Sequence, residues 1–289
     1  MERIVDVAPD VRLWVEETGC PDGSPLLLIM GANASGLTWP ADLVRALGER
    51  HRVIRYDHRD TGRSTWAFDV QPYAVRDLAD DAVAVLDALG IGRAHVVGMS
   101  MGGTLVQLLL LDHPDRLLSA TLFATAALEG AGQDGAAPAA FTDTDPRLLE
   151  LWQHLADPRD RDTEVAWRVG HWRLLNGAGI PFDAEEFRLM EEQVIDHAGR
   201  HDNTAAHARA DQAGLARGAE LARVTVPTLV IEAPNDPINP PPAAHRVAEA
   251  ISGATVATVP GMGHAMPSAV VGPLAAAVLV HTGRVDAQH

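Results

Sequence analysis

Short apolar runs and amphipathic segments alternate along the first part of the chain. Residues 26–30 are apolar without interruption, which is typical of a strand buried on both faces, and residues 11–17 alternate between apolar and polar positions. Between such runs, residues 41–49 and 77–89 repeat apolar side chains at the spacing of one helix face. Strands that alternate with helices predict a mostly parallel sheet covered by helices.

The alternation stops near residue 126 and resumes near residue 225. In between, apolar residues recur at helical spacing over 148–155, 163–175 and 184–197, whereas residues 226–231 resume the strand pattern. This pattern predicts a helical insertion between two parts of one sheet domain. The expected organisation is a first core part over residues 1–125, a helical cap over 126–224 and a second core part over 225–289.

A serine between two glycines lies at one predicted strand-to-helix junction. Gly98, Ser100 and Gly102 form a Gly-x-Ser-x-Gly motif between the strand-like run 94–97 and the helical segment 103–109. In the nucleophile elbow of the α/β-hydrolase fold, the turn is so tight that its flanks need glycine, and the serine hydroxyl is exposed above the sheet. The motif predicts an α/β-hydrolase fold, with a mostly parallel central sheet flanked by helices and an inserted helical cap.

Two further side chains follow later strands in the order that this fold uses. A serine hydroxyl needs a base to remove its proton and a carboxylate to orient that base, and the chain order in α/β-hydrolases is serine, acid, histidine. Asp236 comes just after the apolar run 226–231, and His264 lies in a Gly-rich loop before the last helical segment. Because sites gather at the carboxyl ends of parallel strands, we expect Ser100, Asp236 and His264 to form a catalytic triad.

An acyl-transfer site also needs two hydrogen-bond donors for the oxyanion. The backbone amide of Met101, next to the serine, is one candidate, and the backbone amide of Ala32 in the Gly-rich loop 31–36 is the second. Asn33 in the same loop is a candidate for substrate binding. Aromatic side chains of the cap either line a pocket for a flat aromatic ligand or form the cap's own core, and both interpretations stay open. These side chains are Trp152, Trp167, Trp172 and Phe187.

Composition and charge limit the possible partners. A formal net charge of −16 at pH 7 disfavours nucleic acid and anionic membrane surfaces. The sequence contains no lysine, which excludes a Schiff-base lysine and a lysine-containing phosphate loop. The single Cys20 cannot form an intramolecular disulfide, the first residues lack the pattern of a signal peptide, and the apolar segment 269–280 is too short to span a bilayer. We therefore expect a soluble, cytoplasmic protein.

Two charged patterns admit a functional and a structural interpretation. Residues 57–64 carry several charges after a predicted strand, and a salt-bridged loop that supports the site is favoured over substrate binding. His197 and His201 have the spacing of metal ligands on a helix, but no third ligand is specified, so a solvated face of the cap is favoured. We expect neither a metal nor an organic cofactor.

Together the motifs resemble those of the aclacinomycin methylesterases, which are α/β-hydrolases of Streptomyces anthracycline biosynthesis. The matching segments are 30–33 (MGAN), 56–64 (YDHRDTGRS), 98–102 (GMSMG), 235–237 (NDP), 261–264 (GMGH) and, in the cap, 172–175 (WRLL), 180–183 (IPFD) and 195–199 (IDHAG). The resemblance implies that Ser100 is the nucleophile, His264 the base and Asp236 its partner. It also implies that Met101 and Ala32 supply the oxyanion amides, with Ala32 standing where the family pattern has glycine.

The resemblance implies removal of the methyl group from a carbomethoxy substituent of a polyketide. The expected function is therefore a serine carboxylesterase that hydrolyses the methyl ester of a bulky aromatic polyketide through an acyl-enzyme. Its partner is a small-molecule ester, and the sequence does not predict an oligomeric state. Two alternatives stay open. One is another Ser-His-Asp activity on this fold, as a general esterase, a C–C bond hydrolase or a cofactor-free haloperoxidase; the other is a non-catalytic ligand receptor.

Overall fold

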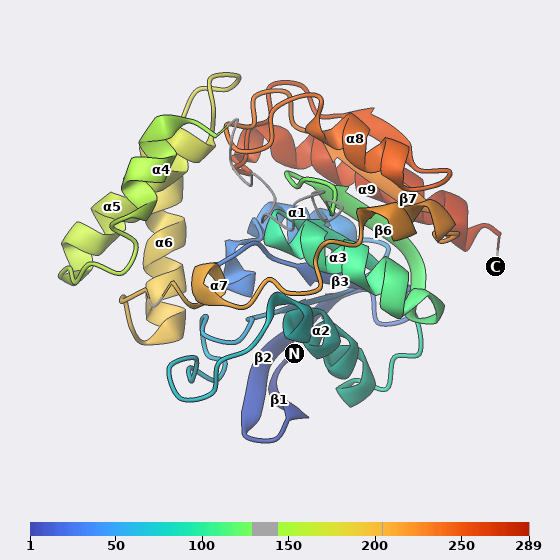
Figure 1. The fold of residues 1–289 in the computed structure, drawn as a ribbon, viewed down its shortest axis with the longest axis horizontal. Coiled ribbons are helices and arrows are strands. Elements are labelled where there is room, and N and C mark those ends of the chain that lie inside the picture. Colours follow the sequence, from blue (N-terminus) through green and yellow to red (C-terminus); the bar gives the residue numbers. More distant parts are fainter. Residues whose placement is uncertain (129–143, 204, 289) are drawn as a thin grey trace.

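A computed structural model describes residues 1–128, 144–203 and 205–288 of the chain (Figure 1). Within these residues, eight strands form one sheet in the order β1-β2-β4-β3-β5-β6-β7-β8. The pairs β1–β2 and β2–β4 are antiparallel, and all other neighbours are parallel, which confirms the predicted mostly parallel sheet. The strands are β1 Glu2–Ala8, β2 Val11–Gly19, β3 Pro25–Ile29, β4 Arg52–Tyr56, β5 Ala94–Met99, β6 Leu117–Phe123, β7 Thr228–Glu232 and β8 Thr255–Thr258.

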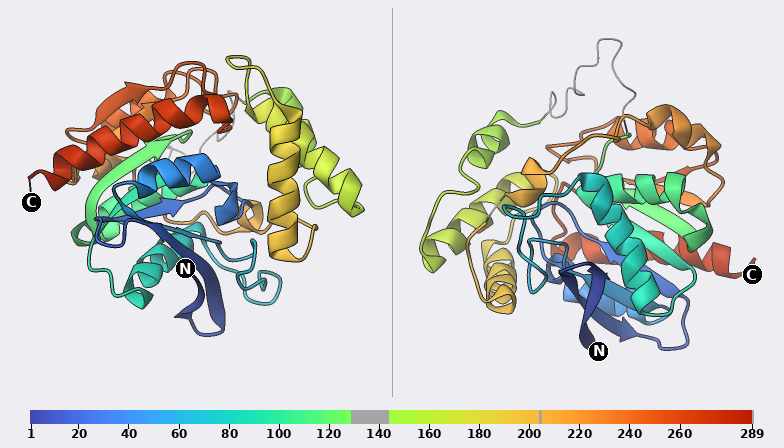
Figure 2. Two further views of the ribbon diagram at one scale, coloured as in Figure 1. Left: turned by 180° about the vertical axis from the view of Figure 1, so that it is seen from behind. Right: turned by 60° about the horizontal axis from the view of Figure 1, so that its bottom comes forward.

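Helices cover both faces of the sheet (Figure 2). Helices α1 and α9 pack on one face, and α2, α3 and α8 pack on the other. The α-helices are α1 Ala41–Gly48, α2 Val75–Ala88, α3 Met101–Asp112, α4 Pro146–Trp152, α5 Arg161–Leu175, α6 Ala184–Ala198, α7 Ala206–Arg209, α8 Ala243–Ala250 and α9 Ser268–Asp286, and short 3-10 turns are η1 Gly36–Thr38, η2 Pro114–Arg116 and η3 Gly218–Arg223. The alternation of strand side chains explains why β3 is apolar throughout, since Leu27 and Ile29 enter one core and Leu26 and Leu28 enter the other.

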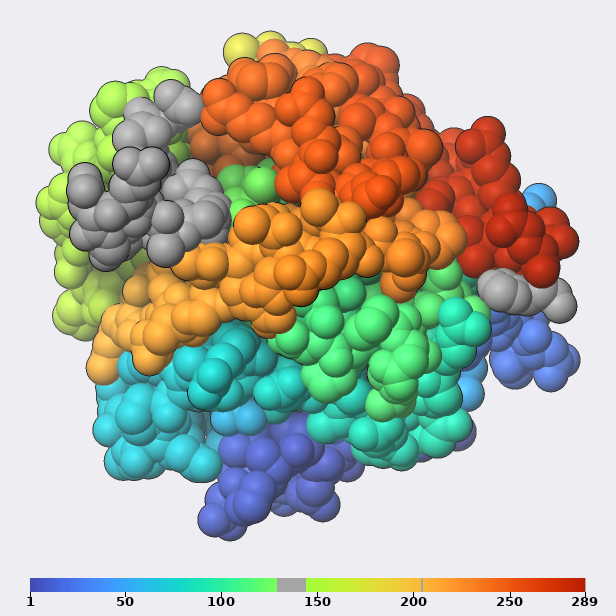
Figure 3. Space-filling model, turned by 45° about the vertical axis from the view of Figure 1, so that its right-hand side comes forward, coloured from blue at the N-terminus to red at the C-terminus, as the bar shows by residue number. Residues whose placement is uncertain are grey.

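Helices α4, α5 and α6 lie together at one side of the sheet domain, within the segment expected as a cap (Figure 1). They have a small apolar core of their own, which Ala265 joins from the loop after β8. Helix α6 also contacts η1 in the loop after β3. Residues 205–224 then return across the surface of the sheet domain (Figure 3), where Asp211 forms an isolated bridge with Ala74.

Helix α9 is longer than the apolar segment 269–280 predicted from the sequence. It has 19 residues and a mean hydropathy of 1.3, enough by length and composition alone to cross a membrane, so the argument from its length was wrong. Val270, Leu274 and Val278 on one side of α9 are buried against the sheet. This packing is that of a core helix.

Candidate active site

Ser100 occupies a sharp turn between β5 and α3. Its φ of 56° and ψ of −121° lie outside the conformations that L-residues usually adopt. A Cβ on Gly98 would lie 2.3 Å from the carbonyl oxygen of Gly102, and a Cβ on Gly102 would lie 2.1 Å from the carbonyl oxygen of Ile29. The chain therefore needs glycine on both sides of Ser100, as the sequence motif predicts.

The structure brings Asp236 and His264 to Ser100 from two separate loops. Asp236 follows β7 and His264 follows β8. The Nε2 atom of His264 lies 2.9 Å from Ser100 Oγ, and its Nδ1 atom lies 2.8 Å from Asp236 Oδ2. With the carboxyl group of Asp236 ionised, Nδ1 must carry the proton and donate it, which leaves Nε2 as the acceptor for the Ser100 hydroxyl.

The carboxyl group of Asp236 is held in its ionised form. It is 2% exposed, and its Oδ1 accepts hydrogen bonds from the backbone amides of Ile238 (2.8 Å) and Asn239 (3.0 Å). Burial raises the pKa of Asp236, but the facing His264 and the two backbone donors outweigh it, so the pKa lies below its ordinary value. The backbone amide of His264 donates to the Leu175 carbonyl (2.8 Å), so the end of α5 helps to place the histidine loop.

The loop of residues 31–36, which we call the β3 loop, runs past Ser100. A Cβ on Gly31 would lie 3.2 Å from the Cβ of Ser100. The next residue, Ala32, is exposed, and Asn33 adopts a left-handed φ of 56°. Across the part of the chain that the structure describes, neither the Ala32 amide nor the Met101 amide bonds a protein acceptor. Both amides are therefore free to donate to a bound oxyanion.

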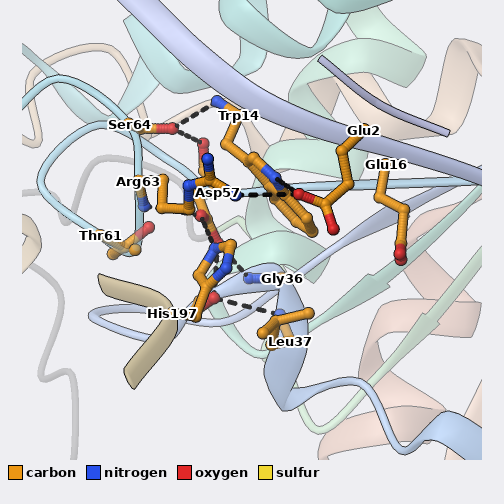
Figure 4. Close-up of polar contacts among 12 residues, drawn as sticks. Glu2, Trp14, Glu16, Gly36, Leu37, Asp57, Thr61, Arg63, Ser64 and His197 are labelled. Atoms are coloured by element: carbon orange, nitrogen blue, oxygen red, sulfur yellow. Dashed lines mark hydrogen bonds and ion pairs between the residues drawn. The ribbon is translucent and has the colours of Figure 1, made fainter. Parts of the chain in front are cut away.

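Asp57, directly after β4, joins three segments around the site (Figure 4). Its carboxylate accepts hydrogen bonds from Ser35 Oγ (2.5 Å) and the Gly36 amide (2.8 Å) in the β3 loop, and from the Arg63 amide (2.9 Å). It also bonds Nε2 of His197 on α6 at 2.7 Å. Burial raises the pKa of Asp57, but His197 and the other donors lower it further, so the carboxyl group is ionised at neutral pH.

Two other charged side chains of residues 57–64, Arg59 and Arg63, are paired within the protein. Arg59 forms two hydrogen bonds to Asp81 (2.7 and 2.6 Å), and the Arg63 guanidinium bonds Glu2 (2.9 Å). These pairs support the interpretation of the segment as a salt-bridged loop that holds the site's surroundings.

His197 is not on a solvated face of the cap, and that expectation was wrong. Its side chain is only 8% exposed, because it bonds Asp57 and packs edge-on against the Trp14 ring at 4.5 Å. His201 bonds the Arg159 carbonyl at 3.1 Å. Helix α6 ends at Ala198, and Gly199 after it is left-handed, so the two histidines do not share one helix as their spacing predicted.

One group of metal-ligating side chains does occur within residues 1–128, 144–203 and 205–288, but elsewhere. His51, His95 and Asp286 place ligand atoms within 4.8 Å of one another, near the amino end of β5 and therefore away from Ser100. Their ring nitrogens already have protein partners, since His51 Nε2 bonds Thr282 (2.8 Å) and His95 Nε2 bonds Asp286 (2.9 Å). These contacts form a hydrogen-bond network between the sheet and α9.

The cap aromatics divide into two groups. Trp172 and Phe187 stack on each other with ring centroids 5.5 Å apart and are buried in the cap's apolar core. Trp152 and Trp167 are half-buried and both contact His171, with Trp152 Nε1 donating to His171 Nε2 at 3.0 Å. The packing favours the core interpretation for Trp172 and Phe187. Trp152 packs against the same core, and the Arg159 guanidinium lies 4.3 Å from the centroid of the Trp167 ring.

Sequence reasoning missed three histidines near the site. Burial, and then the neighbouring His264, lower the pKa of His171 on α5 to about 4, so its imidazole is neutral at pH 7. His58 Nε2 donates to the Met30 carbonyl (3.0 Å), and His207 Nδ1 accepts from the Asn33 amide (2.8 Å). His58 falls within the charged segment after β4, whereas His171 and His207 carried no pattern that distinguishes them from other helix residues.

Comparison with known proteins agrees with this geometry. The family model for the alpha/beta hydrolase fold matches residues 24–267. The chain is 46% identical over 284 residues to rhodomycin D methylesterase DauP of Streptomyces sp. (strain C5) and to rhodomycin D methylesterase DnrP of Streptomyces peucetius, which covers 94% of this chain and 95% of each relative. A crystal structure of a hydrolase from Pseudomonas aeruginosa PA01 superposes with a TM-score of 0.70 at 28% identity, covering 98% of both chains. The predicted resemblance to methylesterases is thereby confirmed, and the chain belongs to the α/β-hydrolase family.

Proposed function

We propose that this protein is a serine carboxylesterase that hydrolyses the methyl ester of a bulky aromatic polyketide of the anthracycline type. The observation that carries the proposal is that the His264 imidazole bridges the other two side chains. Its Nε2 atom lies 2.9 Å from Ser100 Oγ, and its Nδ1 atom lies 2.8 Å from Asp236 Oδ2. Identity of 46% to two rhodomycin D methylesterases over almost the whole chain supports the choice of ester.

The geometry supports a two-step reaction. Ser100 Oγ attacks the ester carbonyl carbon while its proton moves to His264 Nε2, and the Asp236 carboxylate stabilises the imidazolium that forms. The tetrahedral oxyanion accepts hydrogen bonds from the Met101 and Ala32 amides. When the bond from carbonyl carbon to methoxy oxygen breaks, His264 returns the proton to that oxygen, methanol leaves, and Ser100 carries the acyl group.

The second step releases the acid. A water molecule gives a proton to His264 Nε2 and its oxygen adds to the acyl carbon, forming a second oxyanion at the same two amides. The bond to Ser100 Oγ then breaks as the serine takes the proton back, and the carboxylic acid leaves. Apart from the ester and water, these steps need only side chains and backbone amides of this chain.

The test follows the methyl ester of an aclacinomycin-type anthracycline by mass spectrometry. Wild-type protein is expected to convert it to the free acid or its decarboxylated product, and Ser100→Ala is expected to lose turnover by on the order of 10⁶-fold. Ser252→Ala, at an exposed serine in the turn after α8, is the matched control and should behave as wild type.

The alternatives predict other results. Hydrolysis of a p-nitrophenyl ester without conversion of the anthracycline would leave a general esterase and reject the proposed substrate. Turnover by Ser100→Ala at the wild-type rate would reject Ser100 as the nucleophile. A folded wild-type protein that cleaves neither ester would favour the receptor and overturn the proposal.

A further inference from the structure

The β3 loop and Met30 directly before it are held by backbone hydrogen bonds to two buried imidazoles. His58 Nε2 donates to the Met30 carbonyl at 3.0 Å, and His207 Nδ1 accepts from the Asn33 amide at 2.8 Å. His58 comes from the sheet domain, whereas His207 lies on α7, beyond the cap helices. The proposed oxyanion donor, Ala32, stands between these two attachment points.

The hydrogen bonds of His207 define its protonation state. A backbone amide only donates, so His207 Nδ1 must be the acceptor for the Asn33 amide. A backbone carbonyl only accepts, so His207 Nε2 must donate to the Arg59 carbonyl, 2.8 Å away. The imidazole is therefore neutral, with its proton on Nε2. It is 3% exposed and meets the His58 ring edge-on at 5.6 Å, and burial lowers its pKa to about 4.

These contacts fix the peptide planes on either side of the proposed donor. The Met30 carbonyl belongs to the 30–31 peptide, and the Asn33 amide belongs to the 32–33 peptide. The peptide between them carries the Ala32 N–H and includes Gly31, which has wide conformational freedom. Asn33 holds a left-handed φ of 56°, a conformation that costs a non-glycine residue on the order of 1 kcal/mol and persists only where the surroundings impose it.

We propose that His207 is a positioning residue for the reaction, and that it aims the Ala32 amide at the oxyanion by holding the Asn33 amide. The inference rests on the proposed function, because it concerns the same serine and the same oxyanion. Its effect belongs to the transition state, since the oxyanion forms only there. Loss of one oxyanion donor costs ~10²–10³-fold in rate, and a donor that is misaligned rather than absent should cost about 10–100-fold.

Two substitutions separate the two hydrogen bonds of His207. In His207→Asn the side-chain oxygen can take the place of Nδ1 and still accept from Asn33. In His207→Gln the amide nitrogen can take the place of Nε2 and donate to Arg59, but the acceptor for Asn33 is lost. We expect kcat for a p-nitrophenyl ester to fall about 10–100-fold in His207→Gln with KM changed less than about threefold, and to stay within about fivefold of wild type in His207→Asn.

The affinity of a transition-state inhibitor should change if His207 positions the oxyanion donor, and should stay the same if His207 only stabilises the fold. A trifluoromethyl ketone adds to a serine as a tetrahedral oxyanion, so its affinity should fall in His207→Gln by the same factor as kcat/KM. The same two substitutions at His201, which bonds the Arg159 carbonyl, are the controls and should leave kcat within about twofold. Thermal unfolding shows that each variant is folded at the assay temperature.

Different results contradict the role of His207 and the proposed function. Folded His207→Gln with wild-type kcat and inhibitor affinity overturns the role of His207, as does an equal loss of kcat in His207→Asn and His207→Gln. Neither result touches the proposed function, which fails on the Ser100→Ala comparison. If Gln at position 207 prevents folding, His207→Asn decides, because a loss of more than about tenfold in kcat in a folded Asn variant contradicts the proposal.

Discussion

The buried imidazoles of His58 and His207 make the stability of the fold depend on pH between 7 and 5. Burial, and then the neighbouring His207, lower the pKa of His58 from 6.5 to about 3, and burial lowers that of His207 from 6.5 to about 4. The Nδ1 atom of His58 is buried without a hydrogen-bond partner among the described residues, so a proton added there would be unpaired. Both rings stay neutral in the folded protein at pH 5.

The sign of the effect follows from which state binds more protons. Below about pH 6.5 the unfolded chain takes up a proton at each of these histidines and the folded protein does not, so the free energy of unfolding falls as the pH falls. From pH 7 to pH 5 each ring should contribute a loss of about 2 kcal/mol, or about 4 kcal/mol for the pair. The contribution of His207 stops growing below its folded pKa of about 4.

The assay is urea unfolding of wild type and His207→Asn at pH 7, 6 and 5. The variant can be less stable at every pH, but its loss between pH 7 and pH 5 should be smaller than that of wild type by about 2 kcal/mol. Ser252→Ala, which removes no titratable group, should keep the wild-type dependence. Equal losses in wild type and His207→Asn would refute the reasoning. So would an NMR titration of the wild-type protein in which the His207 ring takes up a proton above pH 6.

Further predictions concern the carboxylates, the elbow and metals. Asp236→Asn should lower kcat by about 10⁴-fold without unfolding the protein, because the amide no longer holds the proton on His264 Nδ1; ester kinetics together with circular dichroism check both parts. His197→Ala removes one partner of the buried Asp57 and should lower the free energy of unfolding by about 1–3 kcal/mol, as read by urea unfolding, and an unchanged midpoint would contradict this. Gly102→Ala forces a Cβ to 2.1 Å from the Ile29 carbonyl oxygen, and the variant should lose more than about 2 kcal/mol of stability. Dialysis against a chelator should leave ester turnover unchanged, since every step is assigned to groups of the chain; a loss that added metal restores would contradict this.

The sequence predicted the buried elements of the fold better than its edges. Mainly apolar runs identified β3 and β7, because both faces of these strands are covered by helices. Strand β1 was missed, since it lies at the end of the sheet and only Val5 among its residues is buried, so its pattern is weak. The four-residue helix α7 was also missed, because it is too short to show helical periodicity.

In the site, too, the residues with a local sequence signature were predicted, and the contacts between distant segments were not. Ser100, Asp236 and His264 were predicted because each has a local signature, a turn directly after a strand, in the order that the fold imposes. The contacts around them depend on pairs that are distant in sequence. Asn33 and His207 are 174 residues apart, and nothing local in either segment indicates the partner. A histidine that binds a backbone amide leaves no pattern in a single sequence.

Three such distant contacts tie the predicted cap segment to the catalytic loops. His197 bonds Asp57, His207 bonds the Asn33 amide, and the Leu175 carbonyl accepts from the His264 amide. His207 holds the β3 loop directly, His197 holds it through the buried Asp57, and the Leu175 carbonyl holds the His264 amide, so this segment helps to shape the site. Substitutions of His197 or His207, or ones that displace the end of α5, should misplace the oxyanion donor Ala32 or the base His264. They should therefore lower kcat.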